Sequence, residues 1–195
     1  MIKYKNLKFK TCPKVYEPSD DTFLLLKNLK ICKDDKVLEI GTGIGIIAIF
    51  ASQIAREVVA TDINPYAIQC AKKNAQINSV KNIKFLEGNL FEPINEKFNT
   101  ILFNPPYLPT EDFKELKDEL CLAWDGGSNG RKIIDRFLKE VDKYLKPDGK
   151  IQLVQSSLSN PNKTIDILER KGFEVEITAS KKLFFEELLV ITAFK

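Results

Sequence analysis

The sequence predicts an α/β fold, in which a doubly wound and mainly parallel sheet of seven strands has one antiparallel strand at the C-terminal end. Three observations lead to this fold class. Strand-like and helix-like segments alternate along the chain, which is typical of a parallel sheet covered on both faces. A glycine-rich turn follows the first buried strand. Two strand-like segments then succeed each other at the end of the chain, which indicates a hairpin.

The predicted strands are short apolar or β-branched runs, at Lys36–Ile40, Glu57–Thr61, Ile83–Glu87, Asn99–Phe103, Lys150–Gln155, Glu174–Ala179 and Leu188–Phe194. Helices are predicted from apolar spacing and from cap and proline signals, at Asp20–Leu29, Ile46–Ala55, Pro65–Asn78, Arg131–Tyr144 and Asn160–Lys171. Asp20 is expected to cap the first helix. A turn at Pro147-Asp148-Gly149 is expected before the fifth strand.

The length of 195 residues suits one domain over residues 1–195, with a short N-terminal extension of about residues 1–35. A net charge of +3 is not the strong basic excess that is typical of nucleic-acid-binding domains. The apolar runs are too short for a membrane span, and the N-terminus has no apolar signal-peptide core. We expect a cytoplasmic protein that has no contact with membranes.

Cysteine and histidine usage limits the chemistry. The four cysteines, Cys12, Cys32, Cys70 and Cys121, are far apart and form no Cys-x-x-Cys pair, so we expect free thiols in a reducing compartment. Histidine is absent. The commonest general base and the commonest zinc ligand are therefore missing, and we expect no metal site.

A glycine turn, Gly41-Thr42-Gly43-Ile44-Gly45, connects the first strand to the next helix. Glycines allow close approach of a ligand to the backbone, and Asp62 ends the second strand, where a carboxylate can accept ribose hydroxyls. The turn lacks the Gly-x-Gly-x-x-Gly spacing of dinucleotide binders. Glu39 beside it favours a positively charged ligand. The pattern therefore favours S-adenosylmethionine over NAD; the alternative is a tight turn that binds no ligand.

The tetrapeptide Asn104-Pro105-Pro106-Tyr107 follows the fourth strand, at the edge of the sheet where the glycine turn lies. The two prolines fix the backbone and remove N–H donors. The Asn104 side-chain oxygen and the Pro105 carbonyl can each accept one hydrogen from a substrate –NH2, and the Tyr107 ring can stack on a planar group. This arrangement suits methylation of a planar nitrogen without a strong base. The alternative is an ordinary proline turn.

A long, acidic connection leads from Tyr107 to Arg131. Between Glu111 and Asp125 it has six acidic residues and two lysines, which disfavours a phosphate backbone as substrate. Phe113, Leu116 and Leu120 recur at helical spacing, so a short amphipathic helix is expected there. Trp124 either forms a wall of the substrate channel or belongs to the core.

Three separated segments resemble the short archaeal and eukaryotic branch of the HemK-like release-factor glutamine methyltransferases. These segments are Val15-Tyr16-Glu17-Pro18-Ser19-Asp20-Asp21-Thr22-Phe23, the tetrapeptide, and Ala123-Trp124-Asp125-Gly126-Gly127-Ser128-Asn129-Gly130-Arg131. The resemblance implies the class I methyltransferase fold. It also implies methylation of the side-chain amide of the glutamine in the Gly-Gly-Gln motif of a class 1 translation release factor, with S-adenosylmethionine as cofactor.

The resemblance further implies roles for individual residues. The cofactor would be covered at its methionine end by Tyr16, Asp21 and Thr22. It would be lined by Glu39, Gly41 and Gly43, held at the ribose by Asp62, and contacted at the adenine by Asn89 and Leu90. Asn89 departs from the aspartate that is common at this position. Asn104 would contact both cofactor and substrate, and the substrate site would comprise Asn104, Pro105, Pro106, Tyr107 and Trp124.

The same resemblance implies a small zinc-containing activator subunit, which would add a strand to the edge strand Ile83–Glu87. Alternatively, the charged residues Lys84 and Glu87 only protect that edge from aggregation. Methylation of an adenine or guanine amino group in DNA or RNA would use the same tetrapeptide and remains an alternative activity. Lysine methylation and a non-enzymatic scaffold are two further alternatives.

Overall fold

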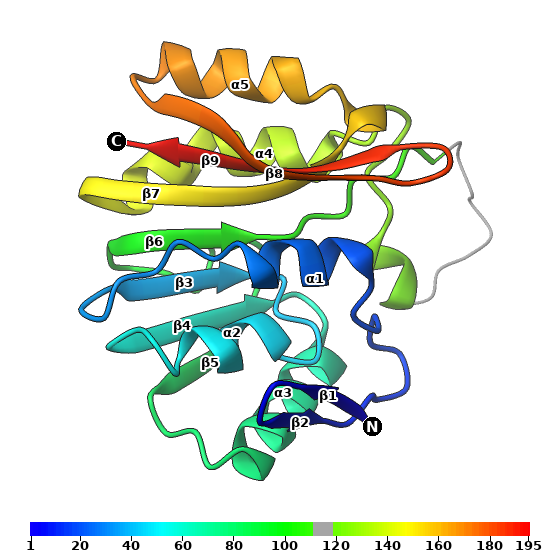
Figure 1. Cartoon of the computed structure of the whole chain (residues 1–195), viewed down its shortest axis with the longest axis vertical. Coiled ribbons are helices and arrows are strands. Elements are labelled where there is room, and N and C mark those ends of the chain that lie inside the picture. Colours follow the sequence, from blue (N-terminus) through cyan, green and yellow to red (C-terminus); the bar gives the residue numbers. More distant parts are fainter. Residues whose placement is uncertain (111–118) are drawn as a thin grey trace.

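The chain forms a seven-stranded sheet covered by helices in the computed structural model, which describes residues 1–110 and 119–195 (Figure 1). The strands are β3 (Lys36–Ile40), β4 (Glu57–Asp62), β5 (Ile83–Glu87), β6 (Phe98–Phe103), β7 (Leu145–Ser156), β8 (Glu174–Lys182) and β9 (Glu187–Phe194). Their order in the sheet is β5-β4-β3-β6-β7-β9-β8. Among the described strands, β9 alone is antiparallel to both neighbours. The predicted fold class, including the antiparallel C-terminal strand, is confirmed.

Helices cover both faces of the sheet. They are α1 (Asp20–Lys27), α2 (Ile46–Ala51), α3 (Pro65–Ile77), α4 (Lys132–Glu140) and α5 (Pro161–Arg170). On one face α1 contacts α2 and α2 contacts α3, whereas α4 packs on α5 on the other (Figure 1). The central strands are therefore buried on both sides, with Val37, Leu38, Ile101 and Leu102 wholly shielded from solvent. This explains their continuous apolar runs.

The helix ends differ from the prediction in several places; α1 ends at Lys27 instead of Leu29, and α4 ends at Glu140, before a 3-10 helix at Val141–Tyr144. Asp20 does not cap α1: Ser19 stands at the N-cap position, while Asp20 is the first helical residue and forms an ion pair of 2.7 Å with Lys181. In α2 the helix ends at Ala51 instead of Ala55. There the Ser52 hydroxyl donates to the Ile49 carbonyl at 2.7 Å, and this local side-chain bond competes with continuation of the helix.

The turn predicted at residues 147–149 lies inside β7 as an irregular stretch. Along β6, Phe98 pairs with Leu145 and Thr100 pairs with Lys150, so the register shifts between them. Asp148 has a positive φ of 57° within this stretch. The extra residues are thus absorbed as a bulge, and β7 begins earlier than its apolar run indicated.

The N-terminal segment forms a hairpin that the sequence analysis did not predict. Its strands are β1 (Ile2–Tyr4) and β2 (Leu7–Phe9), and β2 lies against α3 (Figure 1). The Asn78 side chain accepts from the Lys8 N–H at 2.9 Å and donates to the Lys8 carbonyl at 2.8 Å. Asn74 makes the same pair of bonds with Lys10, at 2.8 and 3.0 Å. Two asparagines of α3 therefore hold this segment by its backbone.

A disulfide joins Cys12 to Cys70, which corrects the expectation that all four thiols are free. Cys32 and Cys121 are free. The hairpin brings Cys12 against α3, where the two Cα atoms are 6.1 Å apart, a separation that suits a disulfide. The two cysteines are 58 residues apart in sequence, so no local spacing motif could indicate the pair.

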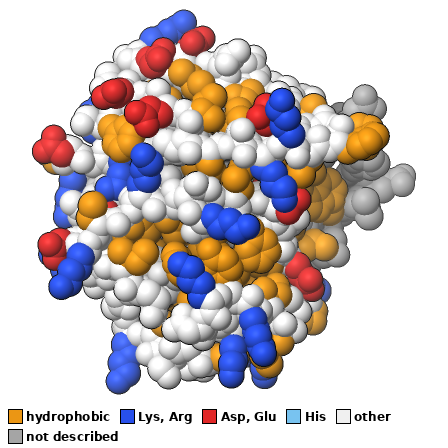
Figure 2. All heavy atoms as spheres, viewed as in Figure 1, with side chains coloured by type: hydrophobic (Ala, Val, Ile, Leu, Met, Phe, Trp, Pro, Cys, Tyr) orange, Lys and Arg blue, Asp and Glu red, His pale blue; other side chains and the backbone are white. Residues whose placement is uncertain are grey.

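In the part of the chain that the structure describes, no helix is long and apolar enough to span a membrane. Figure 2 shows Lys and Arg side chains spread over the viewed face, with Asp and Glu side chains among them in its upper half. This face therefore does not carry the uniform basic field that is typical of nucleic-acid-binding surfaces.

Candidate active site

A cavity of about 300 Å³ opens at the carboxyl ends of β3, β4, β5 and β6. This edge is where ligands bind in doubly wound sheets. Ten residues that the sequence analysis assigned to the site line the cavity, namely Tyr16, Thr22, Glu39, Gly41, Gly43, Asp62, Asn89, Leu90, Asn104 and Pro106. Four others do not line it, namely Asp21, Pro105, Tyr107 and Trp124. Segments from the whole first half of the chain thus meet at one site.

The glycine turn after β3 adopts left-handed backbone conformations. Gly41 has a φ of +69° and lines the cavity, where an added Cβ would stand 3.6 Å from the Phe103 ring. Gly45, with a φ of +86°, has a different reason to be glycine, because its Cβ would stand 2.9 Å from the Cβ of Ala71. The left-handed backbone favours glycine at position 41, and the missing Cβ of Gly45 allows α2 to pack on α3.

Glu39 is a buried carboxyl group in the cavity wall. It is 2% exposed, and its Oε2 accepts from the Thr42 hydroxyl at 2.6 Å. Burial raises the pKa of Glu39 to about 8; the Thr42 hydrogen bond opposes this shift and the charge of Asp62 adds to it. A cation in the cavity would favour the ionised form of this group.

Asp62 ends β4 and is held by backbone donors. Its Oδ2 accepts from the Gly43 N–H at 2.8 Å and its Oδ1 from the Asn64 N–H at 2.9 Å. Burial raises the pKa of Asp62, and these backbone hydrogen bonds act against the shift. Each carboxylate oxygen has a second lone pair. Asp62 can therefore accept two hydroxyl groups side by side while it remains fixed to the glycine turn.

Asn89 and Leu90 lie beyond β5 on the adjoining wall. The Asn89 side-chain oxygen accepts from the Arg136 guanidinium at 3.3 Å, and its backbone N–H donates to Glu92 at 3.2 Å. Leu90 adopts a left-handed conformation with a φ of 53°. The oxygen of the Asn89 side chain therefore faces an arginine of α4.

The start of α1 closes the cavity from the side of the N-terminal segment. Tyr16 and Thr22 line the cavity, whereas Asp21 lies behind it and is 5% exposed. Asp21 Oδ1 accepts from both the backbone N–H and the hydroxyl of Thr22, at 2.5 and 3.1 Å. Burial, followed by the charge of Asp21, raises the pKa of Tyr16 to about 12, so its hydroxyl keeps its proton at neutral pH.

In the tetrapeptide, the two ends of the Asn104 amide differ. Its Nδ2 donates to Asp21 Oδ2 at 3.1 Å. Its Oδ1 is buried and has no hydrogen-bond partner among residues 1–110 and 119–195. Pro105 is buried and Pro106 lines the cavity. A buried acceptor without a partner lowers the stability of a protein by about 1–3 kcal/mol. We therefore expect Asn104 Oδ1 to accept a hydrogen bond from a donor outside the described residues.

Tyr107 is buried, at 8% exposure, and its hydroxyl donates to Asp21 Oδ2 at 3.2 Å. Burial, together with the charge of Asp21, raises the pKa of this phenol. The ring belongs to the hydrophobic core and is not part of the cavity wall. Its stacking on a substrate therefore stays a prediction.

Residues 123–131, one of the three resembling segments, support the tetrapeptide from behind. The Leu108 N–H donates to the Trp124 carbonyl at 3.2 Å, and the Gly126 N–H donates to the Leu108 carbonyl at 3.0 Å. Gly130, with a φ of +70°, packs directly on the Tyr107 carbonyl. Trp124 is half-buried and contributes through its backbone. The segment therefore fixes where the tetrapeptide ends. Phe113 and Leu116, part of the predicted amphipathic stretch, lie outside the described residues.

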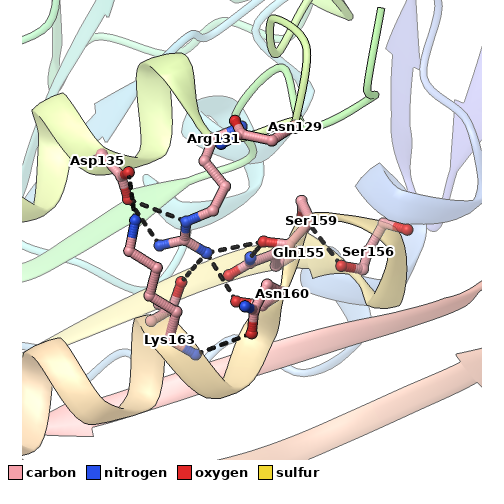
Figure 3. Close-up of polar contacts among 9 residues, drawn as sticks. Asn129, Arg131, Asp135, Gln155, Ser156, Ser159, Asn160 and Lys163 are labelled. Atoms are coloured by element: carbon pink, nitrogen blue, oxygen red, sulfur yellow. Dashed lines mark hydrogen bonds and ion pairs between the residues drawn. The ribbon is translucent and has the colours of Figure 1, made fainter.

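Arg131 anchors this segment to α5. Its guanidinium is buried, at 2% exposure for the residue, and donates to the Ser159 and Asn160 carbonyls at 2.7 Å and to the Thr164 hydroxyl at 3.0 Å (Figure 3). It also forms an ion pair of 2.7 Å with Asp135, one turn along α4. A buried charge with this many hydrogen-bond partners holds the elements that it joins in fixed relative positions.

The sequence analysis missed several cavity residues. Ile63 follows the ribose-type acid Asp62, and Lys132, Ile133 and Arg136 come from the start of α4. The position directly after Asp62 could have identified Ile63. Nothing in the local pattern of α4 distinguishes its cavity-facing residues from an ordinary amphipathic helix.

The strand order, the glycine turn and the cavity at the carboxyl edge, with Glu39 and Asp62 in its wall, define the class I methyltransferase fold. A family model described as "Methyltransferase small domain" matches residues 6–121. A protein of Methanocaldococcus jannaschii, provisionally named protein N5-glutamine methyltransferase, is 50% identical over 100% of this chain and 99% of its own length. Methyltransferase HEMK2 of Homo sapiens is 35% identical over 91% of this chain and 88% of its own length.

Solved structures agree with this assignment. The E. cuniculi Mtq2-Trm112 complex, described as responsible for methylation of the eRF1 translation termination factor, contains a chain that matches with a TM-score of 0.73 and 26% identity. The match covers 93% of this chain and 99% of that chain. A Pyrococcus furiosus methyltransferase, with a TM-score of 0.72 and 20% identity over 98% and 90% of the two chains, shares the fold. This protein therefore belongs to the HemK-like family of protein glutamine methyltransferases, as the resemblance predicted.

Proposed function

We propose that this protein transfers a methyl group from S-adenosylmethionine to the side-chain amide of the glutamine in the Gly-Gly-Gln motif of a class 1 translation release factor. The names of the relatives support this activity, since they are protein glutamine and release-factor glutamine methyltransferases. Within the site, the single observation that carries the proposal is the buried Asn104 Oδ1, which has no partner among the described residues. Release factors act in translation, so the proposal places the protein in the cytoplasm.

Two acids in the cavity wall suit the positive charge of the proposed cofactor. Glu39 and Asp62 are two buried acids in a largely apolar wall, and a positively charged ligand offsets the cost of their burial. Asp62 would hold the ribose hydroxyls, Asn89 and Leu90 the adenine, and Tyr16 and Thr22 the methionine end. When bound, S-adenosylmethionine supplies a methyl group activated on a cationic sulfur.

Asn104 would act on the target amide by position and by charge. Its Oδ1 accepts one hydrogen of the substrate –NH2, and the Pro105 carbonyl is the proposed acceptor for the other. An amide lone pair is delocalised, so the nitrogen becomes a better nucleophile when its hydrogens are held out of the amide plane. The nitrogen would form a bond to the methyl carbon while the bond between that carbon and the sulfonium sulfur breaks and its electron pair stays on the sulfur. The nitrogen would then lose one proton to water. Two fixed acceptors stabilise the positive charge that develops before this proton leaves.

We further propose that a small zinc-containing activator subunit pairs with β5. This strand is at the edge of the sheet and bonds with β4 alone among the described strands. A free edge presents backbone N–H and C=O groups to a partner strand. The solved relative is a complex with Trm112, which supports an activator for this chain as well.

The test is transfer of a labelled methyl group in the presence of the activator. Purified release factor, its Gly-Gly-Gln→Gly-Gly-Ala variant, DNA and RNA are supplied separately. We expect labelling of the unaltered release factor alone, and about a 100-fold or greater loss of kcat in Asn104→Ala, by analogy with the removal of one preorganised charge-stabilising group. Labelling of nucleic acid alone, or of a lysine on the variant factor, would overturn the proposal.

A further inference from the structure

Five hydrogen bonds converge on the carboxyl group of Asp21. Its Oδ1 accepts the two bonds from Thr22, at 2.5 and 3.1 Å. Its Oδ2 accepts from Asn104 Nδ2 at 3.1 Å, from the Tyr107 hydroxyl at 3.2 Å and from the Tyr16 hydroxyl at 3.5 Å. The residue is 5% exposed and does not line the cavity. Asp21 therefore acts on the site through other side chains.

The five donors are not equivalent. A tyrosine hydroxyl both donates and accepts, so Tyr16 and Tyr107 can reverse their roles if their partner changes. The Thr22 bonds go to Oδ1 and would survive on an amide oxygen at the same place. Asn104 Nδ2 carries hydrogens and cannot accept. Of the three groups on Oδ2, only Asn104 therefore depends on an atom that is purely an acceptor.

An asparagine side chain can turn by 180° about its last bond, which exchanges oxygen and nitrogen at nearly the same positions. In Asn104 this exchange decides whether the end away from Asp21 is an acceptor or a donor. The observed bond from Nδ2 to Asp21 leaves Oδ1 as the free end. A substrate –NH2 needs an acceptor there.

We propose that Asp21 is the positioning residue of the reaction: it fixes the Asn104 side-chain amide with Nδ2 on the carboxylate, and so keeps Oδ1 available to the substrate nitrogen. This inference rests on the proposed function. It assigns Asp21 to the orientation of the substrate acceptor, whereas the family resemblance implies a place over the methionine end of the cofactor. It also gives a physical link between two segments that are 83 residues apart.

Asp21→Asn is the direct test. Its new –NH2 replaces Oδ2, so the Asn104 amide must turn to offer Oδ1 to it, and the free end becomes a donor. We expect kcat to fall about 100-fold while the dissociation constant for S-adenosylmethionine changes less than about threefold. Asp20→Asn is the matched control, because Asp20 is exposed in its pair with Lys181. It should retain wild-type kcat.

A swapped pair separates positioning from a general structural role. In Asp21→Asn with Asn104→Asp, the amide at position 21 donates to one carboxylate oxygen at position 104, and the other oxygen becomes the free acceptor. We expect this double variant to recover at least about tenfold in kcat over Asp21→Asn alone, a strongly non-additive result. A double variant no more active than the Asp21→Asn single variant would overturn the proposal.

A substrate-independent measurement keeps this test distinct from that of the proposed function. NMR of ¹⁵N-labelled protein follows hydrogen exchange at the Asn104 side-chain amide. We expect slow exchange in the wild type and in Asp20→Asn. In Asp21→Asn it should be at least about tenfold faster, because Nδ2 loses its acceptor. Equal exchange rates would contradict the positioning role even if the release factor is methylated. Conversely, faster exchange without release-factor methylation would support the positioning role and reject the proposed substrate.

Discussion

The Thr42 hydroxyl donates to the Glu39 carboxyl group at 2.6 Å, inside a wall of the cavity that solvent barely reaches. The bond joins the glycine turn to a titratable group of β3 whose pKa is raised by burial. Whether Glu39 carries its proton therefore affects both the stability of the protein and the charge of the cavity.

Glu39 should make the cofactor-free protein less stable as pH rises. The pKa of Glu39 is about 8 in the fold, against 4.5 for a fully solvated glutamate. Between these values the folded form binds a proton that the unfolded form does not. The stabilisation is therefore complete below the unfolded pKa and is lost as pH rises through the folded one, with a slope approaching about 1.4 kcal/mol per pH unit.

Urea unfolding at several pH values between 5 and 8 measures this effect. We expect Glu39→Gln to lose less stability than the wild type over the range, because an amide does not titrate. Asp62, whose pKa is also raised, contributes the same sign in both proteins, so the difference between the two curves reports Glu39 together with its electrostatic coupling to Asp62. Parallel curves for the two proteins would mean that Glu39 is already ionised in the fold.

Gly130→Ala should destabilise the protein more than Gly172→Ala. Both glycines have a positive φ, +70° and +82°. Both changes therefore place an alanine in the left-handed region of the backbone, which costs about 1–2 kcal/mol. A Cβ at Gly130 would in addition collide with the Tyr107 carbonyl, whereas no described atom lies within 4 Å of one at Gly172. We expect a further loss of about 1–3 kcal/mol at position 130.

Activity separates these two variants further. Because the Gly130 contact fixes the carbonyl of the last tetrapeptide residue, Gly130→Ala should also lower kcat. Gly172→Ala should leave kcat at the wild-type value, measured well below both melting temperatures. If both variants lose the same stability and neither loses activity, the contacts between residues 123–131 and the tetrapeptide are not needed for catalysis.

The Cys12–Cys70 disulfide should stabilise the protein against its reduced form. It closes a loop of 58 residues, for which chain entropy gives about 4 kcal/mol as an upper figure. Thiol labelling of the unfolded, unreduced protein should find two free thiols, on Cys32 and Cys121. Unfolding with and without a reductant then measures the stabilisation, and Cys12→Ser should reproduce the reduced curve. Four reactive thiols before reduction would show that the bond does not form.

The activator should protect one sheet edge and not the other. Hydrogen–deuterium exchange of this protein, alone and with the activator, would report on β5 and β8, which form the two edges. We expect slower exchange over residues 83–87 in the complex and unchanged exchange over residues 174–182. Protection of β8 instead would move the partner to the opposite edge.

The sheet could be predicted because each of its strands has a local signature. Buried parallel strands contain continuous apolar runs, such as Ile101–Phe103. The glycine turn and Asn104-Pro105-Pro106-Tyr107 are contiguous motifs whose place follows from strand order alone. The carboxyl-edge cavity follows from the same rule. These features can be predicted without knowing which residues far apart in the sequence contact each other.

The missed features depend on long-range contacts. Cys12 reaches Cys70 only because the β1–β2 hairpin docks on α3 through Asn74 and Asn78. Tyr107, expected to face a substrate, packs in the hydrophobic core and bonds to Asp21, 86 residues away. Such partners are set by the tertiary fold, which no local period or spacing encodes.

The most direct test of the central claim is mass mapping of the release factor after incubation with this protein, the activator and S-adenosylmethionine. We expect one added methyl group on the glutamine of the Gly-Gly-Gln motif, and none when the Asn104→Ala variant replaces the wild-type protein. A methyl group on any other residue of the factor, or an unmodified factor beside methylated DNA or RNA, would contradict it.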